Sequence, residues 1–266
     1  MSLFDLAGKV AVITGASRGI GRAIAERMAE HGAKIVVSSR KLEACEKVAA
    51  AIEEAGGEAV AVGCDIGRKE DLRALVVAAQ QRFGGIDILV CNAAVNPFFG
   101  LAAEISDDLF DRTMDCNLRS KFWLCNLALP EIAARGGGAV ILISSIAGLR
   151  GSTHLGIYAL SKAAEMQLAR NIAVEWGPRN IRANCIAPGL IRTDFARALW
   201  ENPAVLHRRL IETPLGRIGD PDDIAGAAVF LASSAGAFLT GQTIVIDGGV
   251  TAGQPTLPAV GQGRVA

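Results

Sequence analysis

The chain has 266 residues, in which 27 Lys and Arg balance 27 Asp and Glu, so its formal net charge at pH 7 is zero. This balance argues against the basic surface of a protein that binds nucleic acid or anionic membranes. Hydrophobic residues make up 51% of the chain and charged residues 20%, which is typical of a globular protein of one or two domains. The six cysteines form no C-x-x-C pair, which argues against a zinc or disulfide framework.

Strand-like and helix-like segments alternate along the chain. The strand-like runs are nearly continuous in Val, Ile and Ala, so we expect both faces of a parallel sheet to be covered by helices. The predicted strands are Lys9–Thr14, Ile35–Ser38, Ala59–Val62, Ile86–Val90, Ala139–Ser144, Ile181–Ile186 and Thr243–Ile246, and the predicted helices lie near 19–31, 41–55, 69–83, 107–134, 157–176 and 221–232. The pattern predicts one doubly wound α/β domain over residues 1–250, with a seven-stranded parallel sheet between two helix layers. Residues 192–216 are expected to form a substrate lid, and 251–266 a tail outside the core.

A glycine-rich segment follows the first predicted strand directly and leads into the first predicted helix. Glycines permit a tight turn and close approach of the backbone, and a helix N-terminus offers free N–H groups to a pyrophosphate. The position between strand and helix predicts a dinucleotide site. The residues assigned to it are Gly15, Ser17, Arg18, Gly19, Ile20 and Gly21.

The end of the second strand bears on which dinucleotide is bound. An acidic residue there would hold a ribose 2′-hydroxyl, whereas a cation would accept a 2′-phosphate. The chain has Ser38, Ser39, Arg40 and Lys41, with no acid. We therefore expect Ser39, Arg40 and Arg18 to favour NADP(H) over NAD(H); the alternative is two solvated surface arginines.

A serine, a tyrosine and a lysine have a spacing with a chemical use. Ser145 follows the fifth strand, and Tyr158 comes thirteen positions later on a helix, four residues before Lys162. Residues four apart share one helical face. A neighbouring ammonium is expected to lower the pKa of a phenol, so Tyr158 could act as an acid in carbonyl reduction or as a base in alcohol oxidation. It is the chain's only tyrosine.

From about Leu6 to Gly249 the chain resembles the short-chain dehydrogenase/reductase superfamily, which has the Rossmann fold. Thr14, Gly15, Gly19 and Gly21 match the cofactor loop T-G-x-x-x-G-x-G of that family. The family's catalytic Asn-Ser-Tyr-Lys tetrad corresponds to Asn117, Ser145, Tyr158 and Lys162. One departure is Cys91-Asn92-Ala93-Ala94, where family members commonly have Asn-Asn-Ala-Gly.

The resemblance implies further roles. Asn117 would hold a water that links Lys162 to solvent, and Lys162 and Tyr158 would contact the nicotinamide ribose. The remaining cofactor contacts would come from Asp65 and Ile66 at the adenine, from Asn92, Ala93 and Ala94 on the floor of the site, and from Pro188, Gly189, Ile191 and Thr193 near the nicotinamide. A homotetramer assembled through the helices near 107–134 and 157–176 is also implied.

Segments 91–100 and 187–193, with Trp200, resemble the peroxisomal NADPH-dependent carbonyl and retinol reductases. The chain ends in Gly-Arg-Val-Ala, unlike a peroxisomal address, and its first residues do not resemble a signal peptide, so a cytoplasmic location is expected. The uncharged run from Ile224 to Ile246 is long enough to span a bilayer, but its Ser, Thr, Gly and Gln residues favour a buried helix, a turn and a strand. No membrane partner is expected.

Apolar residues near the site predict a medium-sized apolar ketone, aldehyde or secondary alcohol as substrate. They are Val95, Pro97, Phe98, Phe99, Leu149, Leu155, Phe195, Leu199 and Trp200. Two alternatives stay open. One is a 3-oxoacyl carrier-protein reductase, whose acidic partner would need a basic patch, for which Arg135 and Arg179 are candidates. The other is a catalytically silent regulator that senses NADP.

Overall fold

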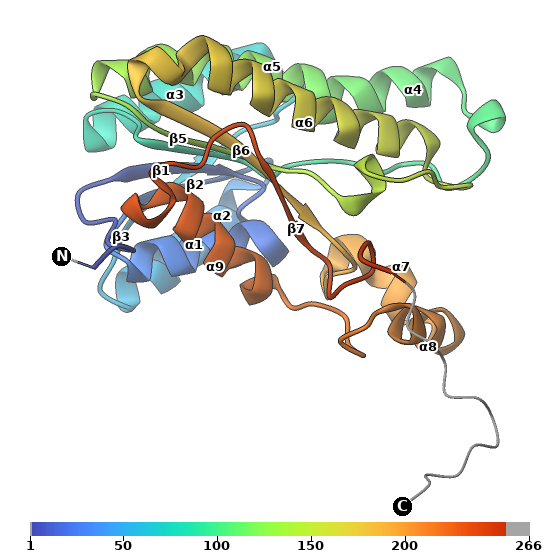
Figure 1. The fold of residues 1–266 in the computed structure, drawn as a ribbon. Helices are drawn as coiled ribbons and strands as arrows, with labels where there is room; N and C mark the ends of the chain where they lie inside the picture. Colours follow the sequence, from blue (N-terminus) through green and yellow to red (C-terminus); the bar gives the residue numbers. More distant parts are fainter. Residues whose placement is uncertain (1, 254–266) are drawn as a thin grey trace, which may run out of the picture.

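The computed structural model of the chain describes residues 2–253, and in these residues seven parallel strands form one sheet (Figure 1). The strands stand in the order β3-β2-β1-β4-β5-β6-β7. Their bounds are Val10–Thr14 (β1), Lys34–Ser39 (β2), Glu58–Gly63 (β3), Ile88–Cys91 (β4), Gly138–Ile143 (β5), Ile181–Pro188 (β6) and Thr243–Ile246 (β7). The winding reverses between β1 and β4, which confirms the doubly wound sheet and places a crevice at the carboxyl ends of these strands.

Helices cover both faces of the sheet (Figure 1): α1, α2 and α9 lie on one face, and α3, α5 and α6 lie on the other. Their bounds are Gly19–Glu30 (α1), Leu42–Glu54 (α2), Lys69–Phe83 (α3), Ser120–Ala134 (α5), Gly156–Trp176 (α6) and Pro221–Ala232 (α9). Successive strand residues point to opposite faces, so Ile13 and Val12 belong to different apolar clusters. The sheet therefore separates two cores, as its continuous apolar strands predict.

The helix expected at 107–134 is interrupted in the middle. Helix α4 covers Asp107–Met114, a π-helical turn covers Asp115–Arg119, and α5 begins at Ser120. Ser106 caps the start of α4, because its hydroxyl accepts from the backbone N–H of Leu109 at 3.4 Å. A π-helical turn is rare and is often found at a functional site, and this one contains Asn117.

The uncharged run from Ile224 to Ile246 folds as expected into most of α9, a short turn and β7. Arg182 of β6 donates to the carbonyls of Leu231 at 2.6 Å and Gly236 at 2.9 Å, and so supplies partners where α9 ends. No helix within residues 2–253 is long and apolar enough to cross a membrane.

The segment 192–216 forms small elements that extend from the carboxyl edge of the sheet, beyond β6 (Figure 1). A 3₁₀ turn at Asp194–Ala196 is followed by α7 (Arg197–Trp200) and α8 (Pro203–Glu212). Asn202 caps α8 by accepting from the backbone N–H of Ala204 at 3.0 Å. The predicted tail lies almost entirely outside the described residues, which end at 253.

Candidate active site

The glycine loop after β1 forms a cradle in which Gly15 and Gly21 have no room for a side chain. Gly15 and Gly19 have positive φ angles of 65° and 55°. A Cβ on Gly15 would lie 2.8 Å from Asn92 Nδ2, and one on Gly21 would lie 2.5 Å from the same atom. The loop opens onto the N-terminus of α1, so the residues present fit a bound pyrophosphate. Ser17 lies in this loop, and Ile20 packs in the first turn of α1 against the core below.

Asn92 and Thr14 brace this loop from beneath. Asn92 Nδ2 donates to the carbonyls of Thr14 and Gly15, both at 3.0 Å. The Thr14 hydroxyl accepts from the backbone N–H groups of Asn92 at 3.1 Å and Ala93 at 3.3 Å. The segment Asn92–Ala94 is thus joined to the glycine loop at the point where the winding of the sheet reverses, the position expected for the floor of the cofactor site.

The ends of β2 and β3 lie side by side at the same edge of the sheet, because the Cys64 N–H donates to the Ser39 carbonyl at 2.9 Å. Arg40 is exposed there, and the Ser39 hydroxyl lies 3.0 Å from Cys45 Sγ. Asp65 and Ile66 follow β3 directly, so they are beside this position. The residues predicted to bind the 2′-phosphate and those predicted to contact the adenine are therefore neighbours.

Arg18 was expected to be free to bind a phosphate, but in the structure it already has an acidic partner. Its guanidinium pairs with Asp194 of the segment 192–216 at 3.4 Å, and both side chains are exposed. Asp194 also pairs with Arg197, and these partners hold the pKa of the Asp194 carboxyl below its usual value. A phosphate on Arg18 would compete with this surface ion pair. The sequence had not singled out Asp194.

The loop after β6 reaches the glycine loop through Thr193. A Cβ on Gly19 would lie 3.1 Å from Thr193 Cγ2, so these two residues are in close proximity. Pro188 ends β6, the Gly189 N–H donates to the Ile246 carbonyl at 2.9 Å, and buried Ile191 pairs with Gly219 in a parallel bridge. The expected nicotinamide segment thus lies beside the expected phosphate loop.

Ser145 and Tyr158 come together at the carboxyl edge of β5. Ser145 precedes a 3₁₀ turn, and its hydroxyl accepts from the Ala147 N–H at 3.1 Å. Tyr158 lies in the first turns of α6, and its ring is 6.4 Å from that of Phe195 in the segment 192–216. Lys162 is one turn further along, with Nζ 5.4 Å from the centre of the Tyr158 ring.

The pKa of Tyr158 differs from the sequence-based expectation. Burial raises the pKa of the phenol well above its usual value, and the negative charge of Glu165 raises it further. A hydrogen bond with Ser145 and the charge of Lys121 lower the pKa by smaller amounts. In the protein alone the pKa is therefore raised rather than lowered as expected, chiefly because burial outweighs the groups that lower it. The ammonium of Lys162 is paired with the Glu165 carboxylate.

Lys162 belongs to a buried group of three charges. Its Nζ donates to Glu165 Oε1 at 2.9 Å and to the Ile143 carbonyl at 2.9 Å. Lys121 of α5 pairs with the same Glu165 oxygen at 2.8 Å. The three side chains are at most 3% exposed. Burial, and to a smaller extent the charge of Lys162, lowers the pKa of Lys121, whereas Glu165 acts to raise it.

Asn117 is fully buried in the π-helical turn and has a structural set of partners. Its Nδ2 donates to the Val95 carbonyl at 2.9 Å and to the Ser161 hydroxyl at 3.0 Å, and its Oδ1 accepts from the Val95 N–H at 2.8 Å. Both amide hydrogens are used, so the side chain holds the loop after β4 against α6. The water-holding role expected from the sequence stays a prediction.

Glu165 and Lys121 are the charged residues at this site that sequence reasoning missed. A signal for each was present, since Glu165 lies three residues after Lys162 and Lys121 four after Asn117, and each pair shares a helical face. The same spacing is equally compatible with two charged side chains in solvent. Only the packing of the helices shows that both are buried.

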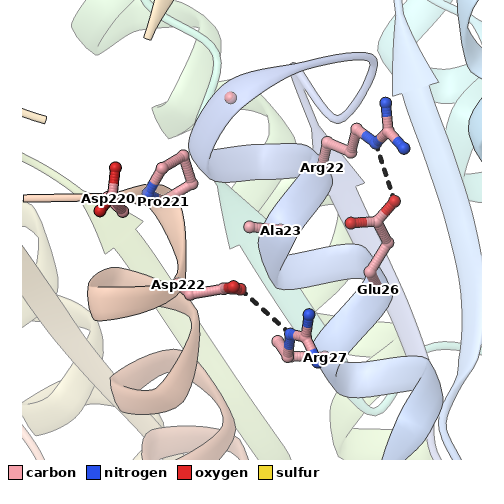
Figure 2. A pocket seen from close by; sticks show the side chains of 8 residues that line it. Arg22, Ala23, Glu26, Arg27, Asp220, Pro221 and Asp222 are labelled. Atoms are coloured by element: carbon pink, nitrogen blue, oxygen red, sulfur yellow. Dashed lines mark hydrogen bonds and ion pairs between the residues drawn. The ribbon is translucent and has the colours of Figure 1, made fainter. Parts of the chain in front are cut away.

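A hollow of about 250 Å³ lies near the glycine loop but belongs to a different surface. It lies between α1 and the start of α9, where Arg22 pairs with Glu26 at 2.7 Å and Arg27 with Asp222 at 3.0 Å (Figure 2). None of Ser145, Tyr158 and Lys162 lines it. The Arg27–Asp222 pair joins α1 to α9.

The chain is similar to known oxidoreductases over nearly its whole length. Residues 15–251 match the family model described as "Enoyl-(Acyl carrier protein) reductase". Dehydrogenase/reductase SDR family member 4 of Homo sapiens is 42% identical over 244 residues, which cover 92% of this chain and 88% of that protein.

Solved structures with the same fold include complexes with either nicotinamide cofactor. A 7α-hydroxysteroid dehydrogenase complexed with NADH and 7-oxo glycochenodeoxycholic acid superposes with a TM-score of 0.89 at 39% identity, covering 92% of this chain and 95% of that one. A gluconate 5-dehydrogenase from Burkholderia cenocepacia J2315, in complex with NADP and tartrate, gives 0.90 at 34% identity, covering 94% and 98%. The chain therefore belongs to the short-chain dehydrogenase/reductase (SDR) family of oxidoreductases, which bind a nicotinamide cofactor.

Proposed function

We propose that this protein is an NADP(H)-dependent oxidoreductase that reduces the carbonyl of an apolar ketone or aldehyde, or oxidises the corresponding secondary alcohol. The observation that carries the proposal is the placement of Ser145, Tyr158 and Lys162 at the carboxyl edge of the sheet, beside a glycine cradle that fits a dinucleotide. In doubly wound folds ligands bind at this edge.

The residues divide the work of acid–base catalysis. NADP(H), when bound, supplies or accepts the hydride. The hydroxyls of Ser145 and Tyr158 orient and polarise the substrate oxygen, and the Tyr158 phenol donates its proton to that oxygen during reduction and takes it back during oxidation. Lys162, whose Nζ lies 5.4 Å from the centre of the Tyr158 ring, assists this proton exchange through its positive charge. General acid–base catalysis of this kind contributes about 10²- to 10⁴-fold to the rate.

The preference for NADP(H) rests on the end of β2, where exposed Arg40 and Ser39 occupy the place of a ribose-binding acid. We expect a higher kcat/KM for NADPH than for NADH. Arg40→Asp should lower kcat/KM for NADPH by about tenfold or more, because a charge-assisted hydrogen bond is worth about 1.5–3 kcal/mol. Arg179→Asp, at an exposed position beside the opposite edge of the sheet, is the control. Equal efficiency with both cofactors, or no change in Arg40→Asp, would contradict the preference.

Aromatic side chains around the crevice support an apolar substrate. Phe195 faces Tyr158, Phe99 stacks on His154 with ring centres 5.1 Å apart, and Trp200 is fixed by donating to the Thr193 carbonyl at 2.9 Å. The similar hydroxysteroid dehydrogenase is complexed with a fused-ring 7-oxo compound, which supports including bulky ring ketones among the compounds tested.

The carrier-protein alternative has one supporting observation, the description of the matching family model. Its proposed basic patch is weakened, because Arg135 pairs with buried Asp87 at 3.0 Å and is only partly exposed. The silent-regulator alternative would leave the Ser145, Tyr158 and Lys162 arrangement without a use.

One screen separates the three functions. NADPH consumption is measured with ketones, aldehydes, quinones and 3-oxoacyl thioesters, including a carrier-protein thioester. Turnover of apolar ketones or aldehydes supports the proposal. A strong preference for the carrier-protein thioester supports the first alternative, and NADPH binding with no turnover of any compound supports the second.

We also propose a homotetramer assembled through α4, α5 and α6. Among the described residues, these helices expose several large apolar side chains, namely Phe110, Phe122, Leu160 and Val174. Contiguous exposed apolar side chains mark association surfaces, and other copies of the chain are the proposed occupants.

A cytoplasmic location is proposed from the six free thiols.

A further inference from the structure

Three buried charged residues, Lys162, Glu165 and Lys121, form a group near Tyr158. Only Lys162 has a role in the proposed reaction. Placing ions in an apolar interior has a large desolvation cost, and removing one partner of a buried pair is strongly destabilising. Replacement by apolar residues of similar size is often tolerated or even stabilising. A packing role alone therefore gives no reason for two ammoniums and a carboxylate at this position.

The geometry joins the three groups into one unit. Oε1 of Glu165 accepts from Lys121 at 2.8 Å and from Lys162 at 2.9 Å, and Oε2 accepts from Lys162 at 3.2 Å. Both ammoniums also donate to the Ile143 carbonyl at the end of β5, Lys162 at 2.9 Å and Lys121 at 3.4 Å. The Lys162 chain is thereby held along α6, on the side of Tyr158 that faces the core.

We propose that Glu165 and Lys121 are positioning residues: the Glu165 carboxylate holds the Lys162 ammonium near the ring of Tyr158, and Lys121 supplies a second positive charge that pairs with the same carboxylate. The inference rests on the proposed function, because it gives Lys162 and Tyr158 their roles in proton transfer. It adds two residues, one on α5 and one on α6, that act on the phenol without touching the substrate.

The groups around Glu165 decide which charges act on the pKa of the Tyr158 phenol. The titratable groups near Glu165 and Lys121 are Lys162 and Tyr158 from α6, Cys125 from α5, Cys91 from β4 and Cys185 from β6. Burial raises the pKa of the Cys185 thiol to about 12. A hydrogen bond with Cys91, followed by burial, raises that of Cys125. Both thiols are thus neutral at physiological pH, so the charges that act on the Tyr158 phenol are those of Glu165 and Lys121.

The single tyrosine of the chain makes a direct test possible, because phenolate absorbance then comes from Tyr158 alone. Each variant is titrated toward alkaline pH while circular dichroism follows its folding. We expect Glu165→Gln to form phenolate in the folded state at a pH about one unit or more below wild type, since a negative charge near the phenol is removed. Lys121→Met should form it at no lower pH than wild type.

The double variant Glu165→Gln with Lys121→Met removes one charge of each sign, and its phenolate should appear between those of Glu165→Gln and wild type. It also provides the test if the single variant does not fold. Glu175→Gln changes an exposed carboxylate on the same helix and should match wild type. Phenolate that appears at the wild-type pH in both Glu165 variants would overturn the proposal.

A second readout separates failure of this inference from failure of the proposed function. With an alcohol substrate and oxidised cofactor, the rising limb of kcat against pH should move to lower pH in Glu165→Gln and stay in place in Glu175→Gln. Absence of turnover in wild type would contradict the proposed function but leave the absorbance titration valid. Turnover in wild type with an unmoved limb in Glu165→Gln would overturn only the inference.

Discussion

Tyr158 has the position of an acid–base group, but its pKa is raised. Its hydroxyl lies near that of Ser145 at the edge of the crevice, as an acid–base group should, yet burial and the charge of Glu165 raise its pKa. A phenol with a raised pKa stays protonated, which suits donation to a carbonyl oxygen, and it becomes a base only when positive charge is brought near. Residue identity and spacing predicted the acid–base group, but not that burial, together with the charge of Glu165, raises its pKa.

This raised pKa predicts how the stability of the protein depends on alkaline pH. The unfolded chain begins to lose the Tyr158 proton near pH ~10, while the folded state retains it. The free energy of unfolding therefore falls above that pH, by at most about 1.4 kcal/mol per pH unit from this residue.

Urea unfolding of wild type and Tyr158→Phe between pH 8 and 11, values chosen to bracket the unfolded pKa, measures this contribution. The difference in unfolding free energy between the two proteins should be constant up to about pH 10 and then shift in favour of Tyr158→Phe. A constant difference throughout would contradict a raised pKa.

Among the elements, the segment 192–216, predicted to be a lid, contacts both the glycine loop and Tyr158. Phe195 lies over Tyr158, Thr193 touches the glycine loop at Gly19, and Asp194 ties the segment to Arg18. Its composition and position after β6 predicted a lid, but the Arg18–Asp194 pair joins residues 176 positions apart and leaves no local signal. For the same reason the π-helical turn at Asn117 escaped prediction, because its partner Val95 lies in another loop.

Limited trypsin digestion tests the lid through its own arginines. NADPH should slow cleavage after Arg208 and Arg209 in wild type, because lid closure over a bound ligand orders the segment. In the absence of NADPH, Asp194→Ala should be cleaved up to about fivefold faster than wild type, the range of a surface ion pair. Glu201→Ala, which removes only a contact within the lid, should behave as wild type. Cleavage unaffected by NADPH would contradict the lid.

At the scale of the whole molecule, the sheet could be predicted almost completely from the sequence. The seven strand-like runs all became strands, since a run of Val, Ile and Ala with helices before and after it can be buried on both faces in only a few ways. The spacing of Ser145, Tyr158 and Lys162 predicted that they share one site, and the structure places them together at the carboxyl edge of the sheet. What could not be predicted were contacts set by tertiary packing, above all the pairing of Lys121 and Lys162 with Glu165.

The exposed apolar face on α4, α5 and α6 gives a prediction for the assembled protein. Light scattering coupled to size-exclusion chromatography should give the mass of four chains. Leu160→Glu should give smaller species, because it places a charge on a 62% exposed apolar position of this face. Leu42→Glu, at a 45% exposed position in the opposite helix layer, should leave the mass unchanged. A monomeric wild type would contradict the tetramer.

The most direct test of the proposed chemistry is a comparison of wild type with Tyr158→Phe, in which turnover and NADPH affinity are measured on the same preparations. Removal of the hydroxyl should lower kcat by at least about 100-fold, because the general acid is lost. The Kd for NADPH should stay near that of wild type, because the glycine cradle and the end of β2 are unchanged. If Tyr158→Phe keeps wild-type turnover, Tyr158 is not the acid–base group and the proposed mechanism is wrong.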